Sequence, residues 1–327
     1  MFFQCKNCGG NIVYNPEKQK MVCPFCESEG TEEKGEKSSY GMGICPNCHG
    51  EIPLEQFTSA MFCPYCNTSI IVDERVEGEY QPRRILPFKL GKEACKQLIK
   101  DRCKKVLFAP ADVMSEARLD SIQGIYVPYW LYDYETEAYY EGEGSQIRKW
   151  RSGDMEYTEV SYYEIVRSMD IPYRLVPADA SIKMPDDVMN LIEPYDYKEF
   201  VPFEERFMSG FNGEVYNMPS GEIKHRAEDK VKRSADGILE SSYSGYANVR
   251  TIQKNINIHE QEASYGLLPV WVYDYSYRGK SYPFYVNGQT GKVVGKVPVS
   301  LSKAFLYATT LFACLTVIIT GISTLIF

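Results

Sequence analysis

The sequence predicts an α+β protein, and three observations carry this prediction. Four Cys-x-x-Cys pairs stand near the front of the chain, a tyrosine-rich segment occurs twice in its middle, and its last 24 residues are uncharged. Together they predict two metal-binding ribbons, a duplicated body of antiparallel sheet and helix, and one carboxy-terminal transmembrane helix. We expect a first ribbon at 1–30, a linker at 31–42, a second ribbon at 43–72, the body at 80–300 and the membrane helix at 304–327.

The terminal segment 304–327 contains neither a charge nor a proline. A helix of this length spans about 36 Å, more than the hydrocarbon core of about 30 Å. A buried core helix is the alternative, but such helices usually carry a polar stripe, and this segment offers Thr, Ser and Gly. Lys292, Lys296 and Lys303 precede it, and positive charge favours the cytoplasmic side. We therefore expect a single-pass anchor in the cell membrane with residues 1–303 in the cytoplasm, and no signal peptide.

Small residues recur along this helix at spacings of four and three. They are Thr309, Ala313, Thr316, Thr320 and Thr324. Such a seam is typical of helices that pack on another membrane helix, although ordinary tolerance of threonine explains it as well.

The cysteine pairs repeat regularly. They are Cys5 and Cys8, Cys23 and Cys26, Cys45 and Cys48, and Cys63 and Cys66. Fourteen residues separate the two pairs of each set, and the sets repeat at a period of 40. Two tight turns that each present two thiolates enclose one tetrahedral ion, so we predict two closed, structural zinc sites. Gly9 and Gly50 suit turns that need a positive φ or close backbone approach. We expect short strands at 11–14 and 20–22.

Three other interpretations explain the cysteines less well. A disulfide framework conflicts with a cytoplasmic location, where thiols stay reduced. A redox site needs one reactive pair beside a βαβ pattern, and here four pairs stand in register. His49 follows Cys48 and can compete with it as a ligand, but four thiolates complete the site without it.

Residues 27–39 contain no apolar side chain and are typical of a solvated linker. We therefore expect the two ribbons to be separate units whose mutual orientation is not fixed by the sequence. A ribbon of fewer than about 40 residues cannot hold a core without its metal, so folding and zinc binding should be one event.

The body repeats itself. The segment 128–134, PYWLYDY, matches 269–275, PVWVYDY, and both alternate so that one Trp and two Tyr share a strand face. Upstream of each stands a Pro-Phe step, at 87–88 and 202–203, followed by a helix. We infer two copies of one unit, with an insertion at 144–199 that holds tyrosine-rich strands and a short acidic turn at 185–187.

Each predicted helix has one apolar side. The first, near 91–107, places Cys95, Ile99, Cys103, Val106 and Leu107 there; the second, near 220–241, places Ile223, Ala227, Val231, Ala235 and Ile238 there. Downstream, residues 282–294 predict a hairpin around Asn287-Gly288, the favoured primed-turn dipeptide. The run 288–292 lacks Walker A spacing, so a turn explains it better than a phosphate loop.

The distribution of charge along the chain indicates which classes of partner it favours. Residues 1–80 hold six Lys or Arg and twelve Asp or Glu, a balance of −6 that disfavours binding to phosphate backbones. The first helix is basic and suits either anionic lipid or nucleic acid, or simply faces solvent. Its basic residues are Lys92, Lys96, Lys100, Arg102, Lys104 and Lys105. The many tyrosines suit half-buried strands or a partner-binding face.

Catalytic motifs are missing from the sequence. Its three histidines, His49, His225 and His259, belong to no HExxH, triad-like or GxSxG pattern, and no nucleotide fingerprint occurs. We therefore expect no enzyme, with no catalytic residue to name. An unrecognised site in the body would require a deep pocket with perturbed ionisable groups.

The chain resembles, over essentially its whole length, the bacterial tail-anchored double zinc-ribbon membrane proteins. The resemblance rests on the two ribbons, the segments VPYWLYDY and LLPVWVYDY, and the stretch YPFYVNGQTGKVVGKVP before the terminal helix. Members are often labelled transcription-factor-IIB-type zinc-ribbon, phage-replication or PriA-like helicase proteins. They are encoded near phage-shock-protein-A-like, SPFH and TPM-domain proteins. The helicase label does not fit this chain, which has no Walker motif and an acidic ribbon end.

The resemblance implies a non-enzymatic adaptor with zinc on the eight paired cysteines, which recruits phage-shock-protein-A-like and SPFH-type proteins to the membrane, with envelope stress as a setting. The lack of catalytic motifs in this sequence, the two closed metal sites and the membrane anchor agree with this interpretation. The alternative is a membrane-tethered nucleic-acid-binding protein of replication or transcription, which would use the ribbons or the basic helix. Salt-dependent retention on DNA or RNA separates the two.

Overall fold

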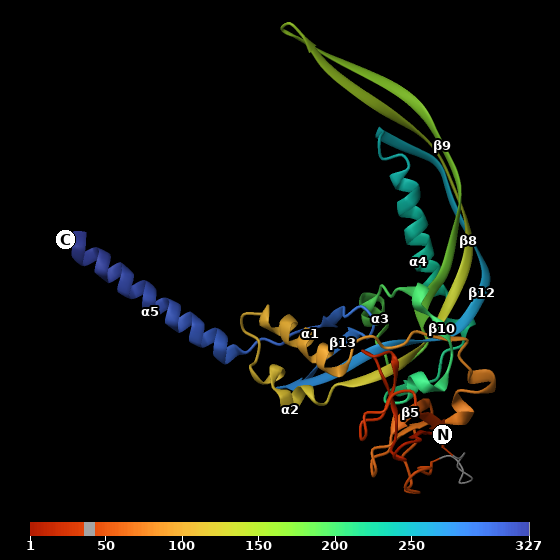
Figure 1. The fold of residues 1–327 in the computed structure, drawn as a ribbon. Helices are drawn as coiled ribbons and strands as arrows, with labels where there is room; N and C mark the ends of the chain where they lie inside the picture. The colour runs from red at the N-terminus through yellow and green to blue at the C-terminus, as the bar shows by residue number, and fades with distance from the viewer. Residues whose placement is uncertain (36–42, 327) are drawn as a thin grey trace.

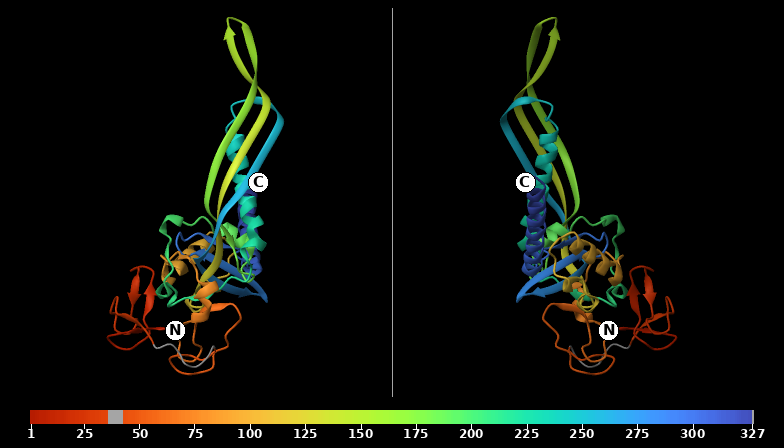
Figure 2. Two further views of the ribbon diagram at one scale, coloured as in Figure 1. Left: turned by 90° about the vertical axis from the view of Figure 1, so that its right-hand side faces the viewer. Right: turned by 90° about the vertical axis from the view of Figure 1, so that its left-hand side faces the viewer.

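The computed structural model describes residues 1–35 and 43–326, with side chains described up to residue 322 of the last helix. An α+β body carries the zinc ribbons at one end, a long curved arm of strands, and a helix that projects away from it (Figures 1 and 2). Within the described residues, the main sheet has ten strands, ordered β10-β7-β12-β8-β11-β5-β6, with β9, β13 and β14 paired off this path.

The elements have the following bounds. The main sheet contains β5 (Thr58–Phe62), β6 (Ser69–Ile71), β7 (Arg84–Ile85), β8 (Gln123–Ser152), β9 (Met155–Asp179), β10 (Val201–Pro202), β11 (Asn212–Glu214), β12 (Ala247–Tyr277), β13 (Lys280–Asn287) and β14 (Val293–Gly295). The first ribbon contains β1 (Phe3–Cys5), β2 (Val13–Asn15), β3 (Lys20–Val22) and β4 (Glu32–Lys34). The α-helices are α1 (Lys92–Lys104), α2 (Glu116–Leu119), α3 (Asp186–Ile192), α4 (Ser220–Ser241) and α5 (Leu301–Ile326). Short 3-10 helices lie at Asp73–Arg75, Gly78–Tyr80, Asp112–Met114, Tyr197–Glu199 and Glu205–Met208.

Three long antiparallel strands, β9, β8 and β12, form the arm, and α4 packs along one face of it (Figure 1). Between residues 132 and 140 of β8, every second side chain is buried, which is the alternation expected of a half-buried strand. These residues are Tyr132, Tyr134, Thr136, Ala138 and Tyr140. The tyrosines beneath α4 are therefore fully buried, whereas Tyr157, Tyr162 and Tyr163 further along the arm are exposed.

The duplication has different boundaries from those we predicted. β7, α1 and β8 form the first unit, and β11, α4 and β12 form the second. β7 of the first unit pairs parallel with β12 of the second, and β11 of the second pairs parallel with β8 of the first. The short strand of each unit therefore lies beside the long strand of the other. The prediction that Pro202-Phe203 opens the second unit was wrong, because Val201–Pro202 is the edge strand β10, which pairs with β7.

Helices α1 and α4 lie close to their predicted positions, but on each helix one residue that we predicted on the apolar side is exposed. Leu107 is exposed because α1 ends at Lys104, three residues before it. On α4 the buried residue is Leu239, and Ile238 is exposed, because the 3.6-residue period brings 239 under 235. Cys95 and Cys103 are buried as expected.

The predicted insertion 144–199 is not a separate unit. β8 runs without a break through Ser145, and β9 returns beside it, so the tyrosine-rich strands extend the sheet of the body. The acidic turn at Pro185 is the start of helix α3, whose first turn holds Asp186 and Asp187. Carboxylates in this position stabilise the positive end of the helix dipole.

The predicted hairpin at 282–294 is confirmed, with β13 antiparallel to β14. Its connection is longer than a two-residue primed turn. The Asn287 side chain accepts hydrogen bonds from the backbone N–H groups of Gln289 and Thr290, both at 2.9 Å, and Gly291 takes a positive φ of 77°. Gly288 is needed for a different reason, since a Cβ there would lie 2.6 Å from the ring of Phe88.

Helix α5 begins at Leu301, three residues earlier than expected, and projects away from the body (Figure 1). Residues Leu301–Ile322 are long and apolar enough to cross a membrane, and none of the span is buried in the protein. The hydroxyls of Thr309, Thr316 and Thr320 donate to backbone carbonyls of the same helix. The side chain of Thr324 lies outside the described residues.

Candidate metal centres and their surroundings

Each Cys-x-x-Cys pair forms the same tight turn. In the first pair, the N–H of Gly9 donates to the carbonyl of Cys5 at 2.8 Å, and the N–H of Cys5 donates to the carbonyl of Gly10 at 2.8 Å. The other three pairs repeat both bonds at 2.9 to 3.0 Å. These bonds point both thiols of a pair to the same side, where the next pair of the set meets them.

The residue after the second cysteine of every pair has a positive φ. These residues are Gly9 at 72°, Glu27 at 59°, His49 at 60° and Asn67 at 57°. Gly9 therefore meets the expectation of a positive φ. Gly50 serves the other purpose, close approach, because a Cβ there would lie 2.8 Å from the ring of Tyr65. His49 contributes its backbone to the turn, and the metal-binding group of this ribbon comprises four cysteines.

The sulfur atoms have the geometry of two metal sites. In each group all four Sγ atoms lie within 4.8 Å of one another. The Sγ atoms of Cys5 and Cys26 are 3.7 Å apart, and those of Cys8 and Cys23 are 3.5 Å apart. A tetrahedron of Zn–S bonds of about 2.3 Å has edges of about 3.8 Å, whereas a disulfide requires about 2.05 Å. Both groups therefore fit a structural zinc ion, with Cys5, Cys8, Cys23 and Cys26 holding one and Cys45, Cys48, Cys63 and Cys66 the other.

Hydroxyl groups support the thiolates, a feature that we did not predict. Ser28 and Thr31 hydrogen-bond to Cys5 Sγ at 3.1 and 3.3 Å, and these bonds lower the pKa of that thiol to about 5. Thr68 lies 3.3 Å from Cys66 Sγ in the second ribbon. Both Ser28 and Thr68 stand two residues after the last cysteine of their set, so the sequence held this signal. A stabilised thiolate is the form that binds zinc.

The prediction of a linker at 31–42 was wrong at its start. Residues Glu32–Lys34 form β4, which pairs antiparallel with β1 and closes the first ribbon. Residues without apolar side chains can still pair through their backbone, which is why composition missed this strand. The remaining residues of the predicted linker, 36–42, lie outside the described part of the chain.

The ribbons are not separate units, contrary to our expectation. The side chain of Asn11 in the first ribbon accepts a hydrogen bond from Ser69 N in the second at 3.0 Å. The second ribbon supplies β5 and β6 to the main sheet through β11. The first ribbon reaches the body through Ser209, whose hydroxyl donates to Ile12 O at 2.9 Å. Both metal centres are thus part of one folded structure with the body.

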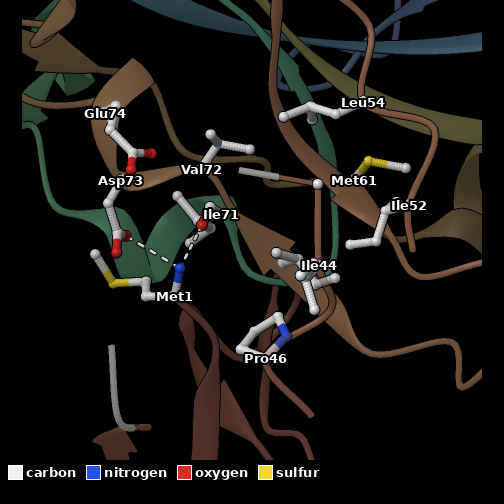
Figure 3. A pocket seen from close by; sticks show the side chains of 12 residues that line it. Met1, Ile44, Pro46, Ile52, Leu54, Met61, Ile71, Val72, Asp73 and Glu74 are labelled. Carbon is white, nitrogen blue, oxygen red and sulfur yellow. Dashed lines mark hydrogen bonds and ion pairs between the residues drawn. The ribbon is translucent and has the colours of Figure 1, made fainter. Parts of the chain in front are cut away.

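A small cavity of about 80 Å³, lined by apolar side chains and by Asp73 and Glu74, lies where the second ribbon meets the start of the chain (Figure 3). Ile44, Ile52 and Met61 line it, and Met1 N donates to Ile71 O and pairs with Asp73 at 3.1 Å. Its size and lining are those of a packing gap, so we assign it no ligand.

The basic stripe on α1 divides into two parts. Lys96 is buried and bonds to Glu93 at 2.6 Å and to Asp120 at 2.7 Å, Lys100 pairs with Glu116, and Lys92 donates to Asp120 O. These lysines hold α1 against α2. The last part, Arg102, Lys104 and Lys105, is exposed.

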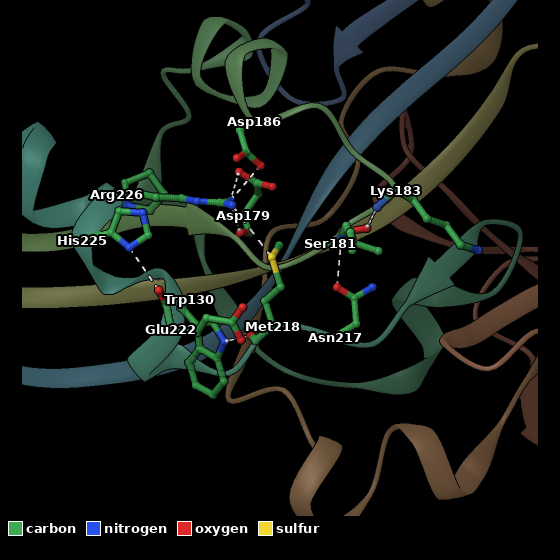
Figure 4. Close-up of polar contacts among 12 residues, drawn as sticks. Trp130, Asp179, Ser181, Lys183, Asp186, Asn217, Met218, Glu222, His225 and Arg226 are labelled. Carbon is green, nitrogen blue, oxygen red and sulfur yellow. Dashed lines mark hydrogen bonds and ion pairs between the residues drawn. The ribbon is translucent and has the colours of Figure 1, made fainter.

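A polar cluster links β9, α3 and α4 (Figure 4). Arg226 donates to Asp186 at 2.8 Å and lies 3.7 Å from Asp179. Burial, reinforced by the nearby charge of Asp186, raises the pKa of Asp179 to about 7. The cluster ties three elements together, and it contains no histidine in contact with Asp179, because His225 bonds to Glu222 O on its own helix at 3.0 Å. We interpret the contact of Arg226 with Asp186 as a structural ion pair.

The comparisons with known proteins agree with this arrangement. Residues 4–31 match a zinc ribbon domain family. Along the chain, 310 residues are 34% identical to a protein of Bacillus subtilis (strain 168), uncharacterized protein YdjG, covering 92% of this chain and 91% of that protein. The chain belongs to the YdjG family. No solved structure matches it.

The match to YdjG covers most of both chains, so it extends well beyond the ribbons into the duplicated body. The zinc ribbon domain family covers the first of the two metal centres. The name of YdjG states no activity.

Proposed function

We propose that this protein is a membrane-anchored zinc-ribbon adaptor that recruits partner proteins to the membrane. The observation that carries the proposal is the outer end of the arm. β12 stops pairing with β8 at Ser145, and the β8–β9 hairpin continues alone to Ser152 and Met155 (Figure 1). A two-stranded hairpin is marginally stable by itself in water, so a bound partner would stabilise this one.

Both faces of the outer hairpin expose apolar side chains. Trp150 and Tyr157 stack across the strands on one face, with ring centroids 5.5 Å apart. Ile147 pairs with Val160 on the other face, and Tyr162 beside them is 83% exposed. Exposed clusters of aromatic and aliphatic side chains are typical of surfaces that bind proteins.

The two metal centres serve a structural purpose in this proposal. All four positions of each site are filled by thiolates, which leaves no open position for a substrate. Helix α5 would span the cell membrane, and Lys292, Lys296 and Lys303 before it favour a cytoplasmic location for the rest of the chain. The partners implied by resemblance are phage-shock-protein-A-like and SPFH-type membrane proteins.

Site-specific crosslinking in native membranes tests the proposal. A photoreactive residue replaces Tyr162 on the outer hairpin, and a matched one replaces Lys232 on the exposed side of α4. We expect Tyr162 to capture one or a few specific proteins and Lys232 to capture none of them. Equal, non-specific labelling at both positions would contradict an adaptor role. Capture of DNA or RNA, weakened by salt, would favour the nucleic-acid-binding alternative.

A further inference from the structure

The loop after α1, Lys105–Ala109, is attached to the base of α5. Ser300 N donates to Phe108 O at 2.7 Å, and Lys303 Nζ donates to Ala109 O at 2.7 Å. The ring of Phe108 packs edge-on against Tyr307, with centroids 5.6 Å apart. These contacts hold the loop at a fixed height along the helix.

The outermost of these contacts lies inside the apolar span. The span begins at Leu301, and Tyr307 is six residues further along. At about 1.5 Å per residue, the Phe108–Tyr307 contact is about 9 Å beyond the start of the span. If α5 crosses a bilayer, the loop must therefore enter the interfacial layer. Its exposed apolar side chain is that of Leu107, which is 70% exposed and would otherwise face water beside a membrane helix.

Basic residues precede this leucine in the chain. Arg102, Lys104 and Lys105 are exposed at the end of α1; the described residues place no ion pair on Arg102 or Lys105, and the charge of Asp101 acts on Lys105 from further away. Lys104 lies 3.4 Å from Asp101, an exposed pair that contributes little. Lysines earlier on the helix are held by Glu93, Glu116 and Asp120, so only its last turn is available to an external anion.

An apolar tip flanked by cations is the arrangement that binds the surface of an anionic membrane. We propose that the segment Arg102–Ala109 is a second membrane contact: Leu107 inserts among the acyl chains near the headgroups, and Arg102, Lys104 and Lys105 bind the phosphates of anionic lipids. This inference rests on the proposed anchoring by α5. It adds that the body is fixed to the bilayer at two points and cannot swing freely about residue 300.

The test uses the full chain in two preparations of phosphatidylcholine vesicles, one with acyl chains brominated near the headgroup and one with acyl chains brominated near the bilayer centre, because bromine quenches nearby indoles. Leu107→Trp is compared with Phe312→Trp within α5 and with Val160→Trp on the arm, each against the native protein. We expect quenching of the introduced indole at 107 and at 312, and none at 160. Quenching at 312 without quenching at 107 would overturn the second contact alone. No quenching at 312 would overturn the anchoring and this inference with it.

Lipid charge is tested in mixed vesicles of phosphatidylglycerol and phosphatidylcholine with only one lipid brominated. In Leu107→Trp, brominated phosphatidylglycerol should quench more strongly than brominated phosphatidylcholine, by about twofold or more. The triple variant Arg102→Gln/Lys104→Gln/Lys105→Gln should abolish this difference. The matched triple variant Arg148→Gln/Lys149→Gln/Arg151→Gln on the arm should retain it. Equal quenching by both lipids in Leu107→Trp would overturn the role of the cations.

Discussion

Val127 and Leu268 lie directly opposite each other on β8 and β12, and each is the counterpart of the other in the sequence repeat. A pair of equivalent residues that face each other marks a pseudo-twofold axis. The short strands obey the same relation, because Ile85 lies opposite Leu267 and Gly213 lies opposite Tyr126. Since each unit completes the sheet of the other, we conclude that the body folds as a single unit.

The two tryptophans of the repeat make equivalent contacts across this axis. Trp271 Nε1 donates to Leu90 O and Trp130 Nε1 donates to Met218 O, both at 3.0 Å. We predict that Trp130→Phe and Trp271→Phe each lose about 1–3 kcal/mol of unfolding free energy, because a carbonyl loses its donor. Urea denaturation measures both. Trp150→Phe on the exposed hairpin is the control and should change stability by less than about 0.5 kcal/mol; an equal loss there would contradict the assignment.

The sequence was sufficient to predict features that depend on local spacing. Both four-cysteine groups follow from the turn geometry of Cys-x-x-Cys, and α1, α4 and α5 follow from apolar periodicity and length. The short strand β11 carries no such periodicity, since Asn212–Glu214 has only three residues, and the similarity of Pro202-Phe203 to Pro87-Phe88 suggested the wrong segment.

Contacts between distant segments could not be predicted from spacing. The ribbons dock through a shared core, a strand pairing and bonds such as Asn11 to Ser69 and Ser209 to Ile12, and the residues of these bonds have no common pattern in the sequence. The length of the arm could not be predicted from the sequence either. Alternation predicts that residues near 150 are strand, but it does not say that β12 stops pairing at Ser145 and leaves Trp150 exposed.

Loss of one zinc ion should destabilise the body as well as the ribbon. We predict that Cys23→Ser or Cys63→Ser lowers the metal content from two zinc ions per chain to one, measured by elemental analysis. Because Phe3 and Ile12 of the first ribbon share a core with Phe88 of the body, tryptophan fluorescence should also report a lower melting temperature.

Cys314→Ser in α5 is the matched control for the zinc experiment, since this cysteine is exposed and belongs to neither four-cysteine group. It should retain both ions and the native melting temperature. A ribbon variant that loses its zinc but melts like the native protein would show that the ribbons are energetically separate from the body.

Asp179 should make stability depend on pH. Its folded-state pKa of about 7 is above the value of about 3.9 for an unfolded chain, so the folded protein holds this proton more tightly. Charging the buried carboxylate therefore removes stability as pH rises from about 4 to about 7. Asp179→Asn carries no charge and should gain stability relative to the native protein at pH 8, by up to about 4 kcal/mol, but not at pH 4.

The unfolding free energies of Asp179→Asn and of the native protein are compared at each pH, so the effects of other titrating groups, and of zinc loss at low pH, cancel in the difference. Urea denaturation at pH 5, 6, 7 and 8 gives the difference in unfolding free energy. Asp186→Asn is a second variant: it removes a negative charge that helps to raise the pKa of Asp179, so its stability should fall less with rising pH than that of the native protein. A difference for Asp179→Asn that does not change with pH would contradict the raised pKa.

The threonine seam of α5 remains a prediction that membrane-based measurements can decide. Thr309, Ala313, Thr316 and Thr320 lie on one side of the helix, and small residues permit close approach of a second membrane helix. Thr316→Leu/Thr320→Leu enlarges that side without changing the length of the span. We expect weaker co-purification of any membrane partner. Ile318→Leu/Ile322→Leu alters the opposite side and should leave recovery unchanged, so equal recovery with both double variants would assign the threonines to ordinary tolerance within a lipid-facing helix.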